Sequence, residues 1–425
     1  MRTAALAVIG LLVTGWVAIA ASNKARLFVA KHYFPHERED WTPRLASLGI
    51  LRPVRMQVEQ GVSLNLDPRD LVSVSILRSH VWQPEIWDSL KTRLGPGSVL
   101  LDVGAHIGVF SLKGASVVGP QGRVVSFEPN PETLAELRSN VVASHAESIV
   151  TVEPIACSDR DQRLTLFASR GINTGASSLS KENAGAFDQA PKAYPVRARP
   201  IDDVVAELGL TRVDAIKIDV EGAEVSVLRG SAKTLARFHP KVVIEVDARQ
   251  LASFGTTPAD IEKLLRDAGY DQKRLLDESD WEWYCLCPEN TLQSLRTSNM
   301  AASDQLVKGF YSIEEGGWRW AAKDFVIALA IPGNNPKPVL SLDVAVPQAL
   351  LDRIGGTTTL HARVDSTELK PQTFTASSNF TYERALPPST KGGVAEIHFS
   401  MDKALPPAGG DPRELGLIVL GAAIK

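Results

Sequence analysis

Apolar runs that end in acidic or polar residues recur along residues 99–287 and alternate with segments of helical spacing. Short apolar runs bounded by turn residues are typical of buried strands. Their alternation with helical segments predicts an α/β fold, a mostly parallel sheet with right-handed crossovers. We expect its strands, in chain order, within 99–108, 124–130, 149–159, 214–224, 241–247, 270–276 and 282–287.

The pattern changes after the polar stretch at 288–305. Short apolar runs now follow one another, separated by turn clusters such as P-G-N-N-P and R-I-G-G, which predicts an antiparallel all-β sandwich. A chain of 425 residues is long enough for two to three units. We therefore expect a membrane segment with its linker at 1–40, an α/β domain at 41–290, a linker at 291–305 and a sandwich at 306–425.

Residues 4–21 form an uncharged apolar run, close to the roughly 17–25 residues that span a bilayer. It can be read as a cleaved signal peptide with an Ala18-x-Ala20 site, as a signal anchor, or as a buried core helix. Four basic residues follow the run within 22–38, against Arg2 before it. The positive-inside rule then favours an anchor with the rest of the chain in the cytoplasm. We expect a single-pass protein of a bacterial inner membrane.

A glycine-rich turn, V-L-L-D-V-G-A-H-I-G at 99–108, follows the first of these strands. Gly104 and Gly108 let the backbone turn sharply and approach a ligand. Glu128 ends the next strand, where a carboxylate can accept hydrogen bonds from ribose hydroxyls. The turn reads G-x-x-x-G and lacks the close-packed glycines of a dinucleotide site, and Asp102 would repel a pyrophosphate but attract an ammonium group. The pattern favours S-adenosylmethionine over NAD, although the turn alone fits an ordinary strand-to-helix connection.

Four motifs together resemble the FkbM-type methyltransferases: D-V-G-A-H-I-G-V-F-S-L, F-E-P-N-P, G-A-S-S-L at 175–179 and I-K-I-D-V-E-G-A-E. The resemblance covers roughly residues 55–290, and K-I-D-V-E-G-A-E is its most specific part. It implies a class I methyltransferase fold with a Rossmann-like, seven-stranded sheet, S-adenosylmethionine as cofactor, and O-methylation of sugars or natural products. His106 departs from the pattern, because the family more often has asparagine there.

The cofactor site is expected at the strand ends and the turns that follow them. Asp102, Gly104 and Gly108 would line the methionine end of the cofactor, and Glu128 would hold the ribose. The loop from Ala156 to Asp159 would meet the adenine, with Asp159 as an acceptor or simply as a solvated turn acid. The full set of expected cofactor-binding residues is Asp102, Gly104, His106, Gly108, Glu128, Asn130, Ala156 and Asp159.

The catalytic residues are expected at the end of the fourth strand. Removal of the acceptor proton calls for a general base, and Asp219 or Glu221 is the candidate by position. Lys217 alternates with Asp219 and would point to the same face. Glu221 can instead be read as a helix cap. Glu245 and Asp247 with Asp219 could gather Mg²⁺, but no spacing demands it and we expect no metal.

The C-terminal segment resembles, more loosely, the β-sandwich module of bacterial glycan enzymes, through G-F-Y-S-I-E-E-G-G-W-R-W and D-P-R-E-L-G-L. Trp318 and Trp320 would share a strand face and could stack on sugar rings, although core packing explains them as well. Asp411 and Arg413 would form a structural ion pair. The expected function is O-methylation of a sugar hydroxyl on a bacterial envelope glycan or its lipid-linked precursor. The alternatives are an NAD-dependent nucleotide-sugar oxidoreductase and a non-catalytic glycan-binding scaffold.

Charge and cysteine content limit the remaining function classes. The formal net charge is −3 without a basic run, which argues against nucleic acid as a partner. Three cysteines make no disulfide framework, in agreement with a reducing compartment. Cys285 and Cys287 form a poor zinc signature and are expected as core residues. The sequence leaves the oligomeric state open.

Overall fold

The computed structural model describes residues 52–170, 173–333, 337–387, 393–408 and 410–425. The chain divides into two compact units, residues 1–283 and 284–425. The apolar run at 4–21, with its predicted membrane anchor, lies outside the described residues. Within the described ranges, no helix is both long and apolar enough to cross a membrane.

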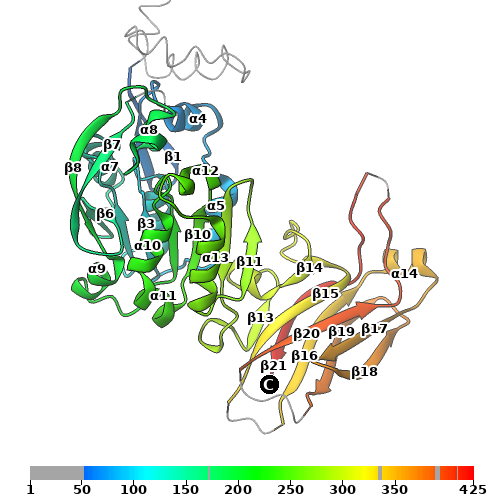
Figure 1. The fold of residues 1–425 in the computed structure, drawn as a ribbon. Helices are drawn as coiled ribbons and strands as arrows, with labels where there is room; N and C mark the ends of the chain where they lie inside the picture. Colours follow the sequence, from blue (N-terminus) through cyan, green and yellow to red (C-terminus); the bar gives the residue numbers. More distant parts are fainter. Residues whose placement is uncertain (1–51, 171–172, 334–336, 388–392, 409) are drawn as a thin grey trace, which may run out of the picture. The chain divides into compact units, whose positions relative to one another are not determined.

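The first unit contains a seven-stranded sheet in the order β11-β12-β10-β9-β3-β4-β5 (Figure 1). Neighbouring strands from β10 to β5 pair in parallel, and β12 pairs antiparallel with β10. This confirms the predicted seven-stranded, mostly parallel sheet. Its strands are β3 Val99–Val103, β4 Arg123–Phe127, β5 Val150–Glu153, β9 Ala215–Ile218, β10 Lys241–Glu245, β11 Gln272–Leu275 and β12 Asp280–Tyr284.

Apolar side chains of the central strands alternate between two cores, one on each face of this sheet. Leu100 packs into the first core, whereas Leu101 packs into the second. Both faces are covered by helices, which explains why every residue of β3 is buried. The first face carries α4 Leu71–Ser79, α5 Pro84–Lys91, α6 Val109–Val118, α7 Pro131–Ala143 and the hairpin β1 Val54–Glu59 and β2 Val62–Leu66. The second carries α9 Ile201–Glu207, α10 Glu224–Gly230, α11 Ala232–Phe238, α12 Ala248–Ala252 and α13 Pro258–Asp267.

The stretch predicted as one strand at 149–159 forms two strands in different sheets. Pro154 follows β5 directly and has no N–H to donate, so the strand ends there. The chain then forms β6 Ala156–Cys157, which belongs to a three-stranded sheet of order β6-β8-β7 with β7 Gln162–Ala168 and β8 Lys192–Arg199. A 3₁₀ turn at Thr174–Ala176 and helix α8 Lys181–Gly185 lie between β7 and β8.

The second unit is a nine-stranded antiparallel sheet rather than two separate layers. The 13-residue strand β15 pairs with β21 at its beginning and with β20 over its second half, so it joins the two halves that a sandwich would keep apart. The antiparallel all-β prediction is confirmed, and the two-sheet sandwich is corrected to one continuous sheet around one core. Its strands are β13 Ser294–Arg296, β14 Lys308–Phe310, β15 Arg319–Ile331, β16 Val339–Val346, β17 Thr358–Val364, β18 Thr367–Phe374, β19 Ser378–Ala385, β20 Gly393–Met401 and β21 Ile418–Ile424, with helix α14 Gln348–Ile354.

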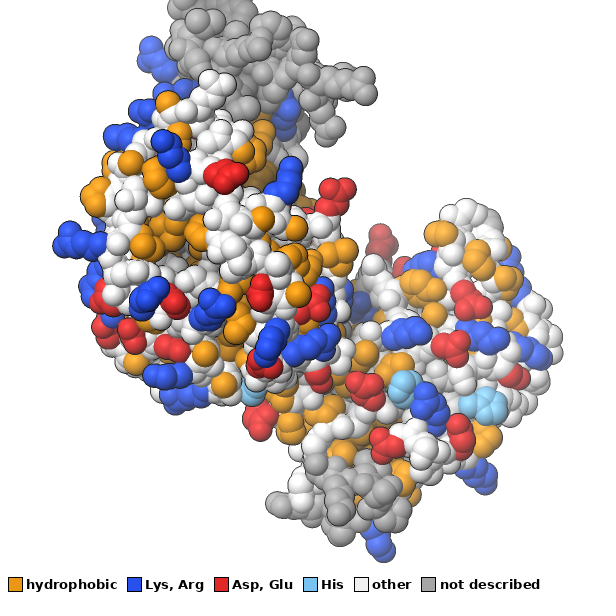
Figure 2. Space-filling view, in the orientation of Figure 1, with side chains coloured by type: hydrophobic (Ala, Val, Ile, Leu, Met, Phe, Trp, Pro, Cys, Tyr) orange, Lys and Arg blue, Asp and Glu red, His pale blue; other side chains and the backbone are white. Residues whose placement is uncertain are grey.

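The boundary between the units differs from the predicted linker at 291–305. The division falls at residues 283 and 284, and β13 within that stretch pairs with β21 of the second unit. Over the face drawn in Figure 2, acidic and basic side chains are interspersed, in keeping with the net charge of −3.

In the second unit, the tryptophans and the ion pair expected from the sequence involve residues two positions apart. Trp318 and Trp320 are half-buried and meet edge to face, with ring centroids 5.8 Å apart. The expected ion pair of Asp411 and Arg413 is confirmed at 2.8 Å, and Arg413 also contacts Glu314.

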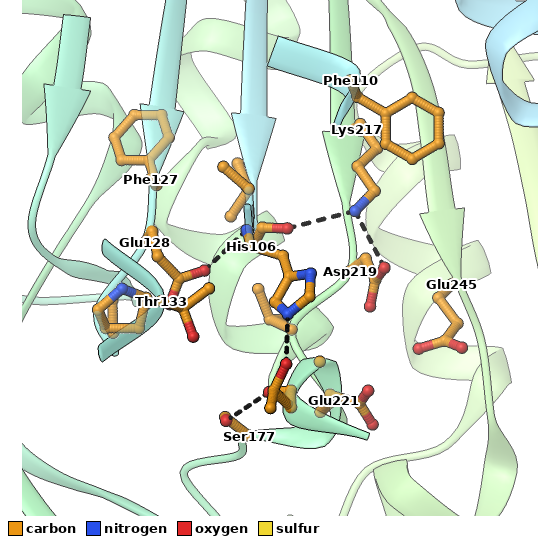
Figure 3. A pocket seen from close by; sticks show the side chains of 18 of the residues that line it. His106, Phe110, Phe127, Glu128, Thr133, Ser177, Lys217, Asp219, Glu221 and Glu245 are labelled. Atoms are coloured by element: carbon orange, nitrogen blue, oxygen red, sulfur yellow. Dashed lines mark hydrogen bonds and ion pairs between the residues drawn. The ribbon is translucent and has the colours of Figure 1, made fainter. Parts of the chain in front are cut away.

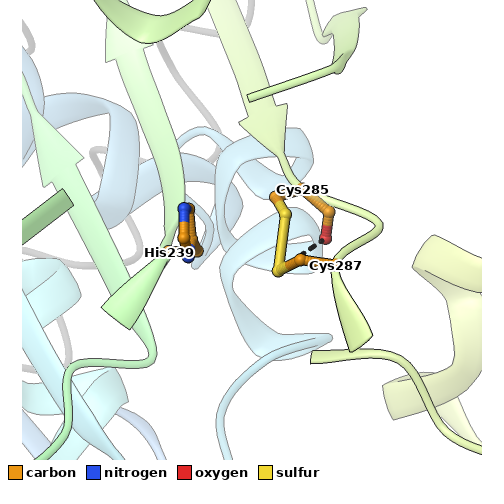
Figure 4. A group of neighbouring side chains, drawn as sticks. All are labelled: His239, Cys285 and Cys287. Atoms are coloured by element: carbon orange, nitrogen blue, oxygen red, sulfur yellow. Dashed lines mark hydrogen bonds between the residues drawn. A yellow bond between two sulfur atoms is a disulfide. The ribbon is translucent and has the colours of Figure 1, made fainter. Parts of the chain in front are cut away.

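The two cysteines of the second unit were expected as core residues without a disulfide. Cys285 is buried, as expected of a core residue, but a disulfide joins it to Cys287 (Figure 4). The third cysteine, Cys157, is free and buried in the first unit.

Candidate functional site

A pocket of about 270 Å³ opens at the carboxyl ends of β3, β4 and β9 (Figure 3). The strand order reverses between β3 and β9, and this is where open α/β sheets bind ligands. Seven of the expected site residues line it: Gly104, His106, Glu128, Ala156, Lys217, Asp219 and Glu221. The other four, Asp102, Gly108, Asn130 and Asp159, are not among its lining residues.

The two glycines of the turn are required mainly by packing against the protein itself. Gly104 has φ +79°, and a Cβ there would lie 1.8 Å from the backbone oxygen of Asp219. Gly108 has φ +90°, and its Cβ would lie 2.5 Å from a methyl carbon of Leu137 on α7. Gly104 therefore lets the turn pack against the end of β9, and Gly108 lets the start of α6 pack against α7. Gly104 also lines the pocket, so the turn forms part of its wall.

Glu128 follows β4 and presents its carboxylate to the pocket. One oxygen, Oε2, accepts from the backbone N–H of His106, and Oε1 accepts from that of Asn130, both at 2.8 Å. Burial raises the pKa of Glu128 to about 7, while the two backbone donors favour its charged form. A carboxylate oxygen accepts more than one hydrogen bond, so each oxygen retains capacity for a ligand hydroxyl.

Asp102 lies beneath the pocket, because its side chain points to the α6 face of the sheet and is fully buried. Its Oδ2 accepts from Ser111 of α6 at 2.5 Å. Burial raises the pKa of Asp102, and the nearby ammonium of Lys217 opposes that rise. The charge partner of Asp102 is thus a lysine of this chain, whereas the sequence suggested a ligand ammonium.

Lys217 and Asp219 point to the same face of the sheet, as the strand period predicted. Lys217 Nζ lies 2.9 Å from Asp219 Oδ2 and donates to the carbonyl of Gly104 at 3.3 Å. The ammonium also lies 5.2 Å from the ring centroid of Phe110. Lys217 is buried and Asp219 is partly exposed, so the pair presents its carboxylate to the pocket.

Glu221 is held in the left-handed region at φ +57°. Its carbonyl accepts from Ser178 Oγ and Asn183 Nδ2, which ties the G-A-S-S-L segment to the end of β9. The side chain of Glu221 does not cap the helix that follows it, which was the alternative interpretation of this residue. Glu224 instead accepts from the backbone N–H of Gly222 at the start of α10.

Three carboxyl groups, those of Asp219, Glu221 and Glu245, lie within 4.8 Å of one another. Burial and then repulsion by Asp219 raise the pKa of Glu221 to about 9 and that of Glu245 to about 10. Asp247, which the sequence grouped with them, caps α12 and pairs with Arg249 at 2.9 Å.

Two further expected residues, Asn130 and Asp159, are not among the residues that line the pocket. Asn130 caps α7 by accepting from the backbone N–H of Glu132, and its amide donates to Ser177 Oγ at 3.3 Å. Asp159 is exposed beside Arg160 and lines a different hollow of the first unit. Both residues of β6, Ala156 and Cys157, still line the pocket, so the chain leaves it between Cys157 and Asp159.

The sequence reading missed a contact between two distant segments. Thr174 lines the pocket and binds both His106 and Asp70, the N-cap of α4. The one available signal was the G-A-S-S-L motif that follows Thr174. Asp70 lies 104 positions away, so no local pattern links the two.

Comparison with known proteins covers this same region. Residues 102–271 match the family model described as the methyltransferase FkbM domain. This segment is FkbM-like. The match covers fewer than half of the 425 residues, so it describes the segment and not the whole chain.

Known relatives match part of this chain, and the match covers only part of their own length. AMB antimetabolite synthetase AmbE of Pseudomonas aeruginosa is 32% identical over an alignment of 238 residues, and the match covers 47% of this chain and 11% of AmbE. The 2-O-methyltransferase NoeI of Sinorhizobium fredii is 28% identical over 151 residues, 33% of this chain and 60% of NoeI. The chain thus spans less than two thirds of either relative.

Among solved structures, the methyltransferase FkbM from Methylobacillus flagellatus matches with a TM-score of 0.33 and 18% identity. The match covers 58% of this chain and 61% of that one. The strand order itself carries the fold assignment.

Proposed function

We propose that the chain is an S-adenosylmethionine-dependent O-methyltransferase that acts on a sugar hydroxyl. The observation that carries this proposal is the acidic pocket at the strand switch point, with Glu128 at the end of β4 and Asp219 at the end of β9. Support comes from the FkbM-like segment, which begins at Asp102 within β3 and includes the whole of β4 and β9.

The lining residues fit this cofactor in three respects. Glu128 has acceptor capacity for ribose hydroxyls. Phe127, Ile155 and Ala156 supply an apolar wall for a flat base. The carboxylate of Asp219 suits an ammonium or sulfonium charge.

The same pocket disfavours NAD. A pyrophosphate needs cationic or N–H partners, but Glu128, Asp219, Glu221 and Glu245 all present carboxyl groups to this space. The lining cation Lys217 is bound to Asp219. The oxidoreductase alternative is thus less well supported.

S-adenosylmethionine, when bound, supplies a methyl group that is already activated for transfer. The protein must hold the acceptor oxygen in line and receive its proton. Glu221 holds a proton of its own at neutral pH, because its pKa is about 9. The carboxylate of Asp219 is already engaged in an ion pair with Lys217.

The acceptor class rests on the relatives and on the second unit. The name of NoeI states a 2-O-methyltransferase, and the FkbM resemblance implies sugars or natural products. We extend this to a glycan of the bacterial envelope or its lipid-linked precursor. The chain would be held at the cytoplasmic face of the inner membrane by residues 4–21, and the half-buried Trp318 and Trp320 are candidates for glycan contact.

Calorimetry on the full chain tests the cofactor. We expect micromolar binding of S-adenosylmethionine, none of NAD, and at least tenfold weaker binding in Glu128→Gln. The exposed Glu147→Gln is the matched control and should bind as the wild type does. NAD binding in place of S-adenosylmethionine would overturn the proposal. Binding without transfer of a labelled methyl group to a panel of simple sugars would favour the scaffold alternative.

A further inference from the structure

His106 stands at the centre of the pocket, between Glu128 and Asp219 in the view of Figure 3. Its backbone adopts φ +51°, a region that His and Asn enter more readily than most residues. The backbone N–H donates to Glu128, and the ring extends into the pocket. The hydrogen bond to Glu128 holds the backbone of His106 in place, and the imidazole ring points from there into the pocket.

Asp70 accepts three hydrogen bonds, which identifies it as an acceptor-only carboxylate. Oδ2 accepts from the backbone N–H of Ser73 at 2.9 Å. Oδ1 accepts from the backbone N–H of Thr174 at 3.2 Å and from its hydroxyl at 2.7 Å.

The Thr174 hydroxyl has one proton, and that proton is directed at Asp70. Its contact with His106 Nε2 at 2.9 Å must therefore be one in which the ring nitrogen donates. A neutral His106 consequently carries its hydrogen on Nε2, and Nδ1 is left with a free lone pair. In the described part of the chain, Nδ1 has no hydrogen-bond partner.

The charges around the ring keep this nitrogen available. Burial lowers the pKa of His106 and Lys217 adds to that effect, while Asp70 and Asp219 oppose it. Glu128 also faces the turn from the end of β4. The ring is neutral in the resting protein, yet two carboxylates lie near enough to stabilise it once it takes up a proton.

We propose that Nδ1 of His106 is the general base that accepts the proton of the acceptor hydroxyl, with Thr174 and Asp70 as positioning residues. This inference rests on the proposed function. The other candidates are less suited: Glu221 and Glu245 hold protons at neutral pH, and Asp219 is bound to Lys217.

The step balances without any further reactant. The acceptor oxygen forms its new bond to the methyl carbon with a lone pair, and the sulfur keeps the electron pair of the bond it loses. The hydroxyl proton passes to Nδ1, giving an imidazolium that later releases it to water. The products are the methyl ether, S-adenosylhomocysteine and one proton.

The first test needs no acceptor. In ¹⁵N-histidine NMR of the full chain without ligand, His106 should carry its proton on Nε2 at pH 7, and Thr174→Val should remove this preference. A proton on Nδ1 in the wild type would overturn the proposal, whatever the acceptor proves to be.

The second test measures transfer. The probes are methyl α-D-glucoside and methyl α-D-glucuronide with labelled S-adenosylmethionine, and His106→Asn is the conservative variant. We expect kcat to fall by roughly 100-fold or more, since a general base contributes about 10²–10⁴. The Kd for S-adenosylmethionine should stay within about threefold, and the acidic limb of the pH profile should disappear. His145→Asn, which replaces an exposed histidine at φ +54°, is the matched control.

Each failure has its own signature. Unchanged kcat in His106→Asn would overturn the base role and leave the proposed function standing. A loss of S-adenosylmethionine binding that matches the loss of rate would make His106 a cofactor ligand instead. Failure of the wild type to bind S-adenosylmethionine would overturn the proposed function itself.

Discussion

Glu221 and Glu245 show how burial changes what a carboxyl group does. Their pKa values are about 9 and about 10, chiefly because both groups are shielded from water and face Asp219. One oxygen of Glu245 is buried without a hydrogen-bond partner, whereas Glu221 accepts from Gln250 at 2.6 Å. At neutral pH both groups therefore act as neutral acids.

Glu245→Gln is expected to stabilise the protein at alkaline pH. The folded state keeps the Glu245 proton up to about pH 10, whereas the ordinary pKa is 4.5. Between these values the unfolded chain binds fewer protons, so stability falls as pH rises. Glutamine removes this dependence, and we expect a gain of roughly 1–3 kcal/mol at pH 8.5 and little change at pH 5. Calorimetric melting of the wild type and of Glu245→Gln at pH 8.5 and at pH 5 measures this change in stability. An equal change at both pH values would contradict a buried, protonated Glu245.

Sequence reasoning found the acids at the strand ends but not their surroundings. Successive side chains of a strand point to opposite faces of the sheet. The positions of Glu128 and Asp219 at the strand ends are therefore enough to predict that their carboxylates reach the pocket. For Asp102 the sequence did not reveal the partners that surround it beneath the pocket, Ser111 of α6 and Lys217 of another strand. Those partners are set by tertiary packing, which a single strand pattern does not contain.

At the scale of elements, the glycine turn controls how closely β3 and β9 approach. Gly104 meets the backbone oxygen of Asp219, so the turn and the end of β9 are packed against each other. Gly97, just before β3, has a similar φ of +83°, but a Cβ added there would meet no atom within 4 Å. The two glycines thus share a backbone conformation and differ in crowding.

Substituting each glycine by alanine separates these effects. Gly97→Ala should cost about 1–2 kcal/mol, because a residue with a side chain is strained in the left-handed region. Gly104→Ala adds a clash and should cost about 2–5 kcal/mol, with weaker binding of S-adenosylmethionine. Denaturant unfolding monitored by circular dichroism compares them. Equal losses would mean that the contact with Asp219 relaxes freely.

Some elements of the second unit have no local sequence signal, because their residues are polar or their partners are distant in the sequence. β18 and β19 are largely exposed and show little apolar alternation, so only their pairing with β17 and β16 defines them. The prediction of separate sandwich layers failed for a similar reason. The apolar run at 325–331 indicates a strand, but it does not indicate that β15 pairs with β21 and then with β20.

At the scale of the molecule, each unit has cores of its own. Two large clusters fill the first unit on either face of its sheet, and a third fills the second unit. The pocket is lined entirely by residues of the first unit. Ligand binding there is expected to act on the stability of that unit.

We expect two thermal transitions in the full chain, of which S-adenosylmethionine raises one. At a concentration of about 100 times Kd, a ligand adds roughly 2.7 kcal/mol, or about 5 °C for a unit of this size. Differential scanning calorimetry with and without the ligand tests this. Glu128→Gln should abolish the shift, and a rise of both transitions together would contradict separate cores.

Ligand binding is expected to change the protonation of Glu221 and Glu245, and the protein would then exchange protons with the buffer. A cation entering beside them favours their charged forms, so binding should expel part of a proton into solution. Apparent affinity for a cationic ligand then rises with pH, and the measured heat depends on the ionisation enthalpy of the buffer. In the proposed reaction the sulfur would lose its positive charge, and the reverse proton uptake by Glu221 and Glu245 would then weaken binding of the demethylated product.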